Sequence, residues 1–371
     1  MESRSFVLPG DRVDSGLDGP NTLVFAFGDP ALDAVRGPVA TLRHAFPSSV
    51  IVGCSTSGQL LDATIVDDGL VAVAARFDHT KLRLARSRID GVADSCAAGR
   101  RLAAQLAHQD LAGVLLLCDG IDVNGSDLVH GLASGLPRGV PIAGGLASDH
   151  AVFAKTWVLA GDELGSGLLA AVGLYGDRLR FMHGCRGGWE TFGPARTVTR
   201  SAGNKLFELD GRPALALYKS YLGVYADDLP GSALRFPLAV QTADRPSHVV
   251  RTVLSVDEDD QSMTFAGDLP KGATARLMRA THDMLVDGAM DAATQCLAGT
   301  RPGPSALALA VSCVGRRLVL GERADEELEA VRSVLGDVPL VGFYSNGEVS
   351  PGDAFSELHN QTMTLVLLVE D

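Results

Sequence analysis

The sequence predicts an α/β protein, with a mixed α+β arrangement as its variant, made of two domains that contain internally repeated β-α-β-β units. Three observations predict this fold class. The length of 371 residues is about twice the ~100–200 residues of a typical domain. Short apolar runs alternate with helical stretches, as in strand–helix–strand units. The same order of elements recurs three times at similar intervals, which indicates internal repetition.

Each repeat begins with an apolar run typical of a buried strand, continues with a helix and reaches a second apolar run that ends in glycine. The first strands are expected at 23–27, 114–118 and 307–313, the helices at 31–45, 126–135 and 322–335, and the second strands at 50–53, 140–144 and 338–342. A closing strand is expected at 69–77, 167–174 and 361–369. The intervals between the first two strands are 27, 26 and 31 residues.

Two repeats are preceded by a further strand and helix. Residues 81–89 and 92–108 precede the second repeat, and residues 274–280 and 282–297 precede the third. In both cases 32 residues separate the two first strands, from Leu82 to Val114 and from Ala275 to Leu307. The equal spacing predicts that these two lead-in segments are equivalent.

The chain ends and the boundary between domains follow from composition. Residues 1–20 are polar and rich in Gly and Asp, so a flexible N-terminal tail is expected. Asp, Pro and Gly cluster at 227–231, and the first domain is therefore assigned to 21–221 and the second to 222–371.

Charge and hydropathy exclude several classes of protein. The net charge is −13 and no basic block stands out, which argues against binding to nucleic acid or to an anionic membrane. No apolar run approaches the ~18 residues of a membrane span, and no export signal is evident, so a cytoplasmic protein is expected. The six cysteines form no CxxC pair, and the nine histidines show no metal-ligand spacing, so no metal site is expected.

The loops that follow the three strand-ending glycines are the candidate ligand site, because ligands commonly bind at the carboxyl ends of strands in α/β sheets. The aligned loops are 53–59, 144–150 and 342–348, and their polar sixth positions, Gln59, His150 and Glu348, are expected to face one cavity. The candidate ligand-binding residues are Cys54, Ser55, Thr56, Gln59, Gly145, Ser148, His150, Cys313, Arg316, Tyr344, Asn346 and Glu348. Arg316 is the candidate for an anionic group, since guanidinium binds carboxylate bidentately, and a structural salt bridge to Glu322 or Asp325 is its alternative.

Motifs for catalysis are missing from the sequence. It holds no GxSxG, no GxxxxGK[ST] and no HExxH, so no catalytic residue is assigned and a protein without enzymatic activity is expected. Cys54 and Cys313 are the candidates for a thiol-dependent enzyme, but neither has an activating base nearby in the sequence.

Several of these segments together resemble the FIST family, with its FIST N and FIST C domains, from about Asn21 to Val369. The segments that carry the resemblance are 52–58 (VGCSTSG), 141–145 (PIAGG), 203–204 with 206–214, 312–316 (SCVGR), 342–349 (GFYSNGEV) and 360–362 (NQT). Gln59 departs from the pattern, because the family often has Glu at this position. The resemblance implies a FIST N-like domain over 21–221 and a FIST C-like domain over 222–371.

The resemblance also implies a function. It implies a cytoplasmic sensory module for signal transduction that binds a small ligand, such as an amino acid or small carboxylate. No cofactor is expected. Such a module would signal through a separate partner, such as a histidine kinase, a chemoreceptor or a cyclic-di-nucleotide enzyme. The alternative is a haem-bound nitric-oxide sensor, with His183 and then His150 as candidate axial ligands. A cysteine-dependent enzyme is the second alternative.

Overall fold

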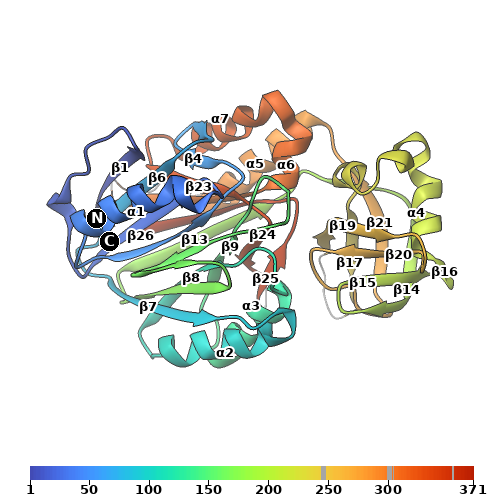
Figure 1. Cartoon of the computed structure of the whole chain (residues 1–371), viewed down its shortest axis with the longest axis horizontal. Coiled ribbons are helices and arrows are strands. Elements are labelled where there is room, and N and C mark those ends of the chain that lie inside the picture. Colours follow the sequence, from blue (N-terminus) through green and yellow to red (C-terminus); the bar gives the residue numbers. More distant parts are fainter. Residues whose placement is uncertain (244–247, 299–302, 304, 353–354) are drawn as a thin grey trace.

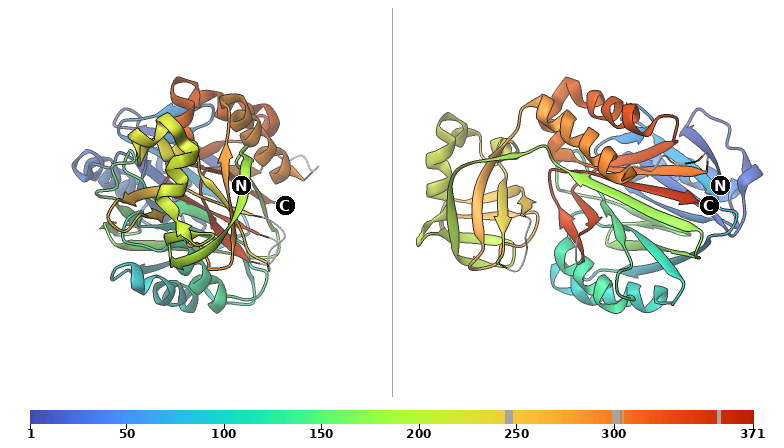
Figure 2. Two further views of the ribbon diagram at one scale, coloured as in Figure 1. Left: turned by 90° about the vertical axis from the view of Figure 1, so that its right-hand side faces the viewer. Right: turned by 180° about the vertical axis from the view of Figure 1, so that it is seen from behind.

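The computed structural model consists of two bodies joined side by side (Figure 1). It describes residues 1–243, 248–298, 303, 305–352 and 355–371. The larger body, here called the three-sheet body, comprises the described residues of 1–189 and 280–371. The smaller one, here called the β-domain, comprises those of 190–279. The two chain ends lie together on the side of the three-sheet body that is remote from the β-domain (Figures 1 and 2).

Three six-stranded sheets with the same strand order make up the larger body. The first sheet runs β1 (Glu2–Leu8), β6 (Leu70–Arg76), β2 (Thr22–Gly28), β3 (Val50–Ser55), β10 (Val158–Ala160) and β11 (Glu163–Gly165). The second runs β7 (Lys81–Arg88), β12 (Leu168–Tyr175), β8 (Leu111–Cys118), β9 (Ile142–Leu146), β24 (Gly347–Pro351) and β25 (Ser356–His359). The third runs β13 (Leu179–Arg186), β26 (Met363–Glu370), β22 (Ala306–Cys313), β23 (Leu340–Ser345), β4 (Gln59–Leu61) and β5 (Thr64–Val66). The α/β fold class with internal repeats is therefore confirmed, and the three repeats share one strand order.

The last two strands of each sheet come from a neighbouring repeat. The hairpin β4–β5 follows β3 in the first repeat but pairs with β23 of the third. The short strand β10 follows β9 in the second repeat but pairs with β3 of the first. The hairpin β24–β25 follows β23 in the third repeat but pairs with β9 of the second. The exchange is cyclic, so each repeat needs both others to complete its sheet.

The sheets share one core and carry helices on their outer faces. Apolar side chains of all three sheets meet in one buried cluster, as the near-continuous apolar strands require. Helix α1 (Leu32–Ala45) covers the first sheet, α2 (Ser95–Leu106) and α3 (Gly125–Gly135) cover the second, and α5 (His282–Leu297) and α7 (Ala324–Leu335) cover the third. A short helix, α6 (Val314–Leu320), follows β22 directly. The 3-10 turns of this body are η1 (Ser15–Leu17), η2 (Val92–Asp94) and η5 (Gly321–Arg323).

The strand-ending glycines occupy the same place in each sheet. Gly53, Gly144 and Gly342 lie opposite Ala26, Leu116 and Ala310 of the neighbouring parallel strand. A Cβ atom at any of these glycines would overlap the carbonyl oxygen of that opposite residue. The close approach of two backbones thus explains why glycine recurs at this point of each repeat.

Two sequence-based expectations are wrong. Residues 1–20 are no flexible tail, because β1 pairs with β6 along its whole length and buries Phe6 and Leu8. The lead-in strands are not equivalent either, although the helices that follow them, α2 and α5, are. The counterpart of β7 is β13, which pairs with the closing strand β26, whereas β21 (Thr274–Arg279) belongs to the β-domain. The β-domain is inserted between β13 and α5, so β21 precedes α5 only as the last strand of the insertion.

The β-domain is one curled sheet with a helix at its side. Its strands follow the order β18 (Val249–Arg251), β17 (Leu238–Gln241), β21, β14 (Glu190–Ala202), β15 (Lys205–Leu209), β20 (Ser262–Phe265) and β19 (Val253–Asp257), with β16 (Arg212–Pro213) beside β15. Its helical elements are α4 (Ala214–Leu222), η3 (Gly223–Asp228) and η4 (Gly231–Arg235). Strands β14 and β21 begin and end the insertion as a pair, with Glu190 opposite Arg279. The boundary assigned at 221/222 falls inside this body, at the end of α4.

Candidate functional site

The three glycine-ended loops meet at one point. Ser57, Ser148 and Asn346 are each the fourth residue after the strand-ending glycine of their repeat. The hydroxyls of Ser57 and Ser148 are hydrogen-bonded to each other, and Ser148 Oγ lies 2.7 Å from Asn346 Oδ1. Asn346 Nδ2 donates in turn to the carbonyl oxygen of Gly120 at 3.3 Å. Equivalent residues of the three repeats thus form one polar chain, here called the loop junction.

Backbone hydrogen bonds close the same junction in a cycle. The amide of Ser148 donates to Ser55 O at 2.9 Å, that of Ser57 to Tyr344 O at 3.0 Å, and that of Asn346 to Leu146 O at 3.2 Å. Each loop therefore donates to one neighbour and accepts from the other. Ser55, Thr56, Ser57 and Ser148 are almost completely buried, and Asn346 is 8% exposed. The junction is therefore closed to solvent, and Asn346 lies at its border.

The residues at the sixth position do not share a cavity. Gln59 lies in β4 and Glu348 in β24, which have left their own repeats to join a neighbouring sheet. His150 is exposed, and its contact with the junction is the donation of its backbone amide to Ser57 Oγ at 2.7 Å. Gly145, within β9, lies opposite Glu348. The strand exchange carries the sixth positions apart.

Arg316 is occupied by a structural ion pair. It is fully buried, and its Nε and Nη2 donate to Glu327 Oε2 at 3.0 and 2.9 Å. Nη1 donates to Gly187 O at 2.6 Å, and Nη2 also donates to Leu285 O at 2.7 Å. Tyr344 donates its hydroxyl to Glu327 Oε1 at 2.7 Å. The carboxylate partner is therefore Glu327, neither Glu322 nor Asp325, and this guanidinium faces no open cavity.

Glu348 is a fully buried carboxyl within a second polar cluster. Ser345 Oγ donates to Oε1 at 2.7 Å, while the amide and hydroxyl of Thr362 donate to Oε2 at 3.1 and 2.9 Å. Burial raises the pKa of Glu348 to about 7, although these hydrogen bonds pull it down. The group is therefore poised to titrate near neutral pH.

The two candidate thiols are buried at the ends of β3 and β22. Burial raises the pKa of Cys54 and of Cys313 well above the ordinary value, and the nearby Glu348 carboxyl adds to the effect at Cys313. A thiolate nucleophile is disfavoured at both positions near neutral pH.

The candidate axial histidines lie apart from each other. His183 is on β13, opposite Val366 of β26, and desolvation lowers its pKa. It is half-buried, whereas His150 is exposed. The haem alternative remains a prediction. Across the residues that the structure describes, no group of three or more His, Cys, Asp or Glu side chains is arranged to hold a metal ion.

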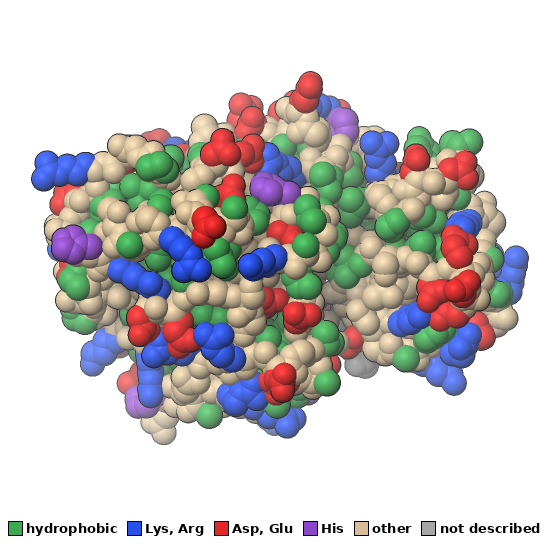
Figure 3. Space-filling view, viewed as in Figure 1, with side chains coloured by type: hydrophobic (Ala, Val, Ile, Leu, Met, Phe, Trp, Pro, Cys, Tyr) green, Lys and Arg blue, Asp and Glu red, His purple; other side chains and the backbone are tan. Residues whose placement is uncertain are grey.

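A cavity of about 290 Å³ lies between the two bodies, beside the loop junction; it is here called the cleft cavity. Figure 3 shows the notch where the bodies meet. The three-sheet body contributes Val92, Gly120, Leu146, Phe153 and Asn346, among others. The β-domain contributes Asn204, Leu254, Ser255, Phe265 and Gly267, among others. One wall of the cavity is thus the border of the loop junction, and the opposite wall is the inserted domain.

A second cavity, of about 490 Å³, follows along the same interface and is here called the charged cavity. It is lined by Asp127 and His130 of α3, Arg251 and Asp268 of the β-domain, and Glu357 of β25. Asn124, which caps the N-terminus of α3, lines the cleft cavity and donates from Nδ2 to Oδ1 of Asp268, a residue of the charged cavity, at 3.0 Å. Its amide is one of the links between the bodies.

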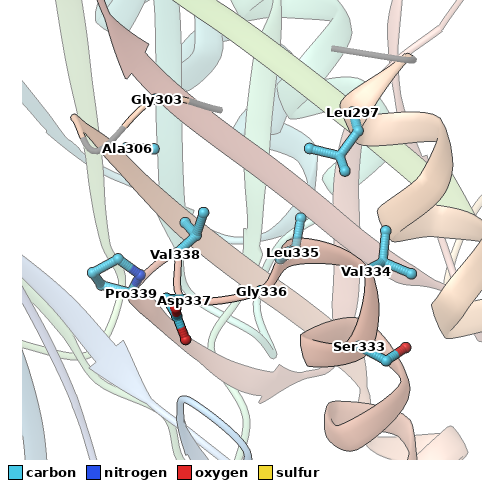
Figure 4. Close-up of a pocket in the computed structure, with 10 residues that line it drawn as sticks. All are labelled: Leu297, Gly303, Ala306, Ser333, Val334, Leu335, Gly336, Asp337, Val338 and Pro339. Carbon is cyan, nitrogen blue, oxygen red and sulfur yellow. The ribbon is translucent and has the colours of Figure 1, made fainter. Parts of the chain in front are cut away.

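A third cavity, of about 480 Å³, is shown in Figure 4. Its lining comes mainly from the C-terminal end of α7 and the segment that leads to β23, with Leu297 of α5 opposite. None of the predicted site residues lines it.

Sequence reasoning selected Ser148 and Asn346 but missed Ser57. The signal was present, because Ser57 stands at the fourth position after its glycine, as do the other two. The residues of the β-domain that line the cleft cavity carried no such signal, since their approach to the loops depends on how the insertion folds back.

Comparison with known families covers most of the chain. The model of the FIST N domain matches residues 22–212, and that of the FIST C domain matches residues 214–351. The junction between the two matches falls within the β-domain, between β16 and α4.

Relatives with similar sequences carry no assigned function. Two uncharacterized proteins of Mycobacterium tuberculosis strains are 27% identical over 271 residues, which is 69% of this chain and 68% of theirs. An uncharacterized protein of Methanocaldococcus jannaschii is 21% identical over 58% of this chain and 43% of its own.

A crystal structure of a cyanuric acid hydrolase from A. caulinodans aligns over 100% of this chain and 98% of its own. Its TM-score of 0.37 and 10% identity are too low to support an argument about fold or activity. Within the described residues, no helix is both long and apolar enough to cross a membrane.

Proposed function

The chain belongs to the FIST family, a family of sensory domains, and we propose that it senses a small ligand in the cleft cavity and signals through a separate protein. The observation that carries the proposal is the position of this cavity. Its walls come from both bodies, and one of them is Asn346 at the border of the loop junction. Concave sites between domains are common places for small ligands.

A ligand in this position would make binding depend on the relative position of the two bodies. The hydrogen bonds that join them include Asn124 to Asp268, Arg251 Nη1 to Leu358 O at 3.1 Å and Gln361 Nε2 to Leu234 O at 3.1 Å. A ligand that contacts both walls favours the arrangement in which both are within reach. Such differential binding shifts the population of conformations, which is how a sensor passes on occupancy.

The loop at Asp149–Lys155 is the element best placed to respond at the mouth of the cavity. Asp149 accepts hydrogen bonds from the amides of Phe153, Ala154 and Lys155 at 2.7–2.9 Å and so holds the loop in a tight curve. Val152 is 69% exposed and Phe153 38% exposed, although both are apolar. Ligand contact with Phe153 would bury apolar surface at the outside of the molecule, where a partner can detect it.

The partner and the absence of catalysis belong to the same proposal. A histidine kinase, a chemoreceptor or a cyclic-di-nucleotide enzyme in the cytoplasm would receive the signal, as the family resemblance implies. The buried thiols of Cys54 and Cys313, with raised pKa, favour a sensor over a thiol-dependent enzyme.

A thermal-shift screen of metabolite-sized compounds tests the proposal, because a ligand that binds the folded state raises its stability. The variant Ser255→Trp places a large side chain in the cleft cavity from an exposed position. Val224→Trp is the matched control, since Val224 is 81% exposed and does not line the cavity. A compound should stabilise the wild type and Val224→Trp but not Ser255→Trp. Compounds that stabilise all three equally would place the ligand elsewhere.

A further inference from the structure

The two cavities of the interface differ sharply in charge. Among the residues that the structure describes, no Asp, Glu, Lys, Arg or His lines the cleft cavity, whereas the charged cavity has five such residues among those named above. Resting on the proposed function, we infer that the ligand of the cleft cavity is uncharged: a compact, mainly apolar molecule with an amide-like donor and acceptor. This inference replaces the amino acid or small carboxylate expected from the sequence.

The two charged side chains that the β-domain contributes to the charged cavity are already hydrogen-bonded. The Asp268 carboxylate accepts from Asn124 Nδ2, and Arg251 donates to the carbonyl oxygens of Val250, Leu358 and Asp268. A charged ligand in the cleft cavity would lose hydration without gaining a counter-ion from the residues that line it, which weakens its binding.

The N-terminus of α3 does not supply an anion site on this side. Asn124 Oδ1 accepts from the amide of Asp127 at 3.2 Å, and the Asp127 side chain lies in the first turn of the helix. The carboxylates of Asp127 and Asp268 both line the charged cavity, where their negative charge compensates the positive end of the α3 dipole.

Polar groups suited to a neutral ligand do line the cleft cavity. Asn204 donates from Nδ2 to Phe265 O at 2.8 Å, and no hydrogen bond of the described residues uses its Oδ1. The same holds for the hydroxyl of Ser255. The β19–β20 ladder is irregular at Leu254, which has no partner in the register there. An acceptor and a hydroxyl beside a bulged strand match a ligand that carries both N–H and C=O groups.

The size of the cavity limits the ligand to a small molecule. Its volume of about 290 Å³ lies just below the ~300–1,000 Å³ of small-molecule sites. Leu146, Phe153 and Phe265 supply apolar surface, so most of the ligand should be apolar.

Matched fragments test the inference by ligand-observed NMR and titration. Each triplet in the set shares one ring system and differs in its side group, as do indole-3-acetamide, indole-3-acetate and tryptamine. Neutral members should bind at least about tenfold more tightly than their charged partners, because a tenfold difference corresponds to about 1.4 kcal/mol and the unpaired charge costs more. Binding should be lost in Ser255→Trp and kept in Val224→Trp. Val92→Trp fills the cavity from the three-sheet body at a residue that is 51% exposed, and should behave like Ser255→Trp.

Two failures are distinguishable. Charged members that bind as tightly as their neutral partners, and lose binding in both filling variants, would overturn the uncharged ligand and leave the cleft as the site. A full set in which no fragment is sensitive to either filling variant would overturn the site itself, and with it both the proposed function and this inference.

Discussion

Glu327 is the partner that makes three buried polar side chains compatible with the core. It accepts hydrogen bonds from Arg316, from Tyr344 and from Ser312 Oγ at 3.0 Å. A buried charge is tolerated when it is paired and its remaining atoms are bonded. The cluster therefore fixes α6 and α7 against β22 and β23.

Glu327→Gln should lower the free energy of unfolding by about 3–5 kcal/mol, because it leaves the Arg316 charge buried without a counter-charge. The matched control is Glu326→Gln, whose side chain is 41% exposed and pairs with Arg323 at the surface. It should lower the free energy of unfolding far less, because an ion pair at the surface is screened by solvent. Urea denaturation followed by circular dichroism measures both. Equal losses of unfolding free energy in the two variants would mean that the buried ion pair contributes no more to stability than the surface pair.

The protonation of Glu348 should make stability depend on pH. Its pKa is about 7 in the folded state against an ordinary 4.5, so the folded chain keeps a proton that the unfolded chain has released. Stability from this group is complete below pH 4.5, falls as the pH rises towards 7 and then levels off. Glu348→Gln should remove about 1–3 kcal/mol of this fall, because one pKa unit corresponds to about 1.4 kcal/mol.

Free energies of unfolding at pH 5 and pH 8 check this expectation. Glu329→Gln is the control, because Glu329 is exposed on α7 and should leave the difference between the two pH values as in the wild type. A Glu348→Gln protein with the full wild-type difference would assign the pH dependence to other groups.

The strand-ending glycines connect residue type with the pairing of strands. A Cβ at Gly342 would overlap the carbonyl oxygen of Ala310 in the parallel neighbour, whereas nothing lies within 4 Å of a Cβ at Gly165 in β11. Gly342→Ala should therefore destabilise the protein by several kcal/mol or prevent folding, as expected of overpacking against backbone. Gly165→Ala should be neutral or slightly stabilising. Thermal unfolding of the two variants decides between this steric account and a general intolerance of alanine in strands.

Much of the arrangement of strands and loops was predictable from the sequence. The features that were not predictable have physical reasons. The apolar runs and glycines located the repeated strands, because buried parallel strands need continuous apolar surface and close backbone contact. The loop junction was implicit in the alignment, at Ser57, Ser148 and Asn346. The prediction that the three sixth positions face one cavity was wrong, because the local sequence pattern does not reveal that β4 and β24 join the sheets of other repeats. The inserted domain hid the equivalence of β7 and β13 for the same reason: β13 and its partner β26 are far apart in sequence.

The molecule as a whole combines an interdependent body with a separable one. The cyclic exchange of β4–β5, β10–β11 and β24–β25 leaves each sheet incomplete without a neighbouring repeat. The β-domain has a core of its own, which includes Val198, Leu215 and Phe265. Its entry and exit strands run side by side, with Glu190 opposite Arg279. The three-sheet body should therefore fold without the β-domain, whereas a single repeat should not fold alone.

Replacing residues 191–278 by a short Gly-Ser linker tests this division. The paired ends of β14 and β21 need little chain to connect them, so the shortened protein should keep cooperative thermal unfolding and the native circular dichroism of the three-sheet body. It should lose every ligand whose binding is sensitive to Ser255→Trp, because one wall of the cleft cavity is removed. A chain ending at residue 78, which holds the first repeat without its neighbours, should stay unfolded, since β3 then lacks β10. An aggregated product after excision would show that the three-sheet body depends on the inserted domain, while a shortened protein that still binds those ligands would move the site away from the cleft.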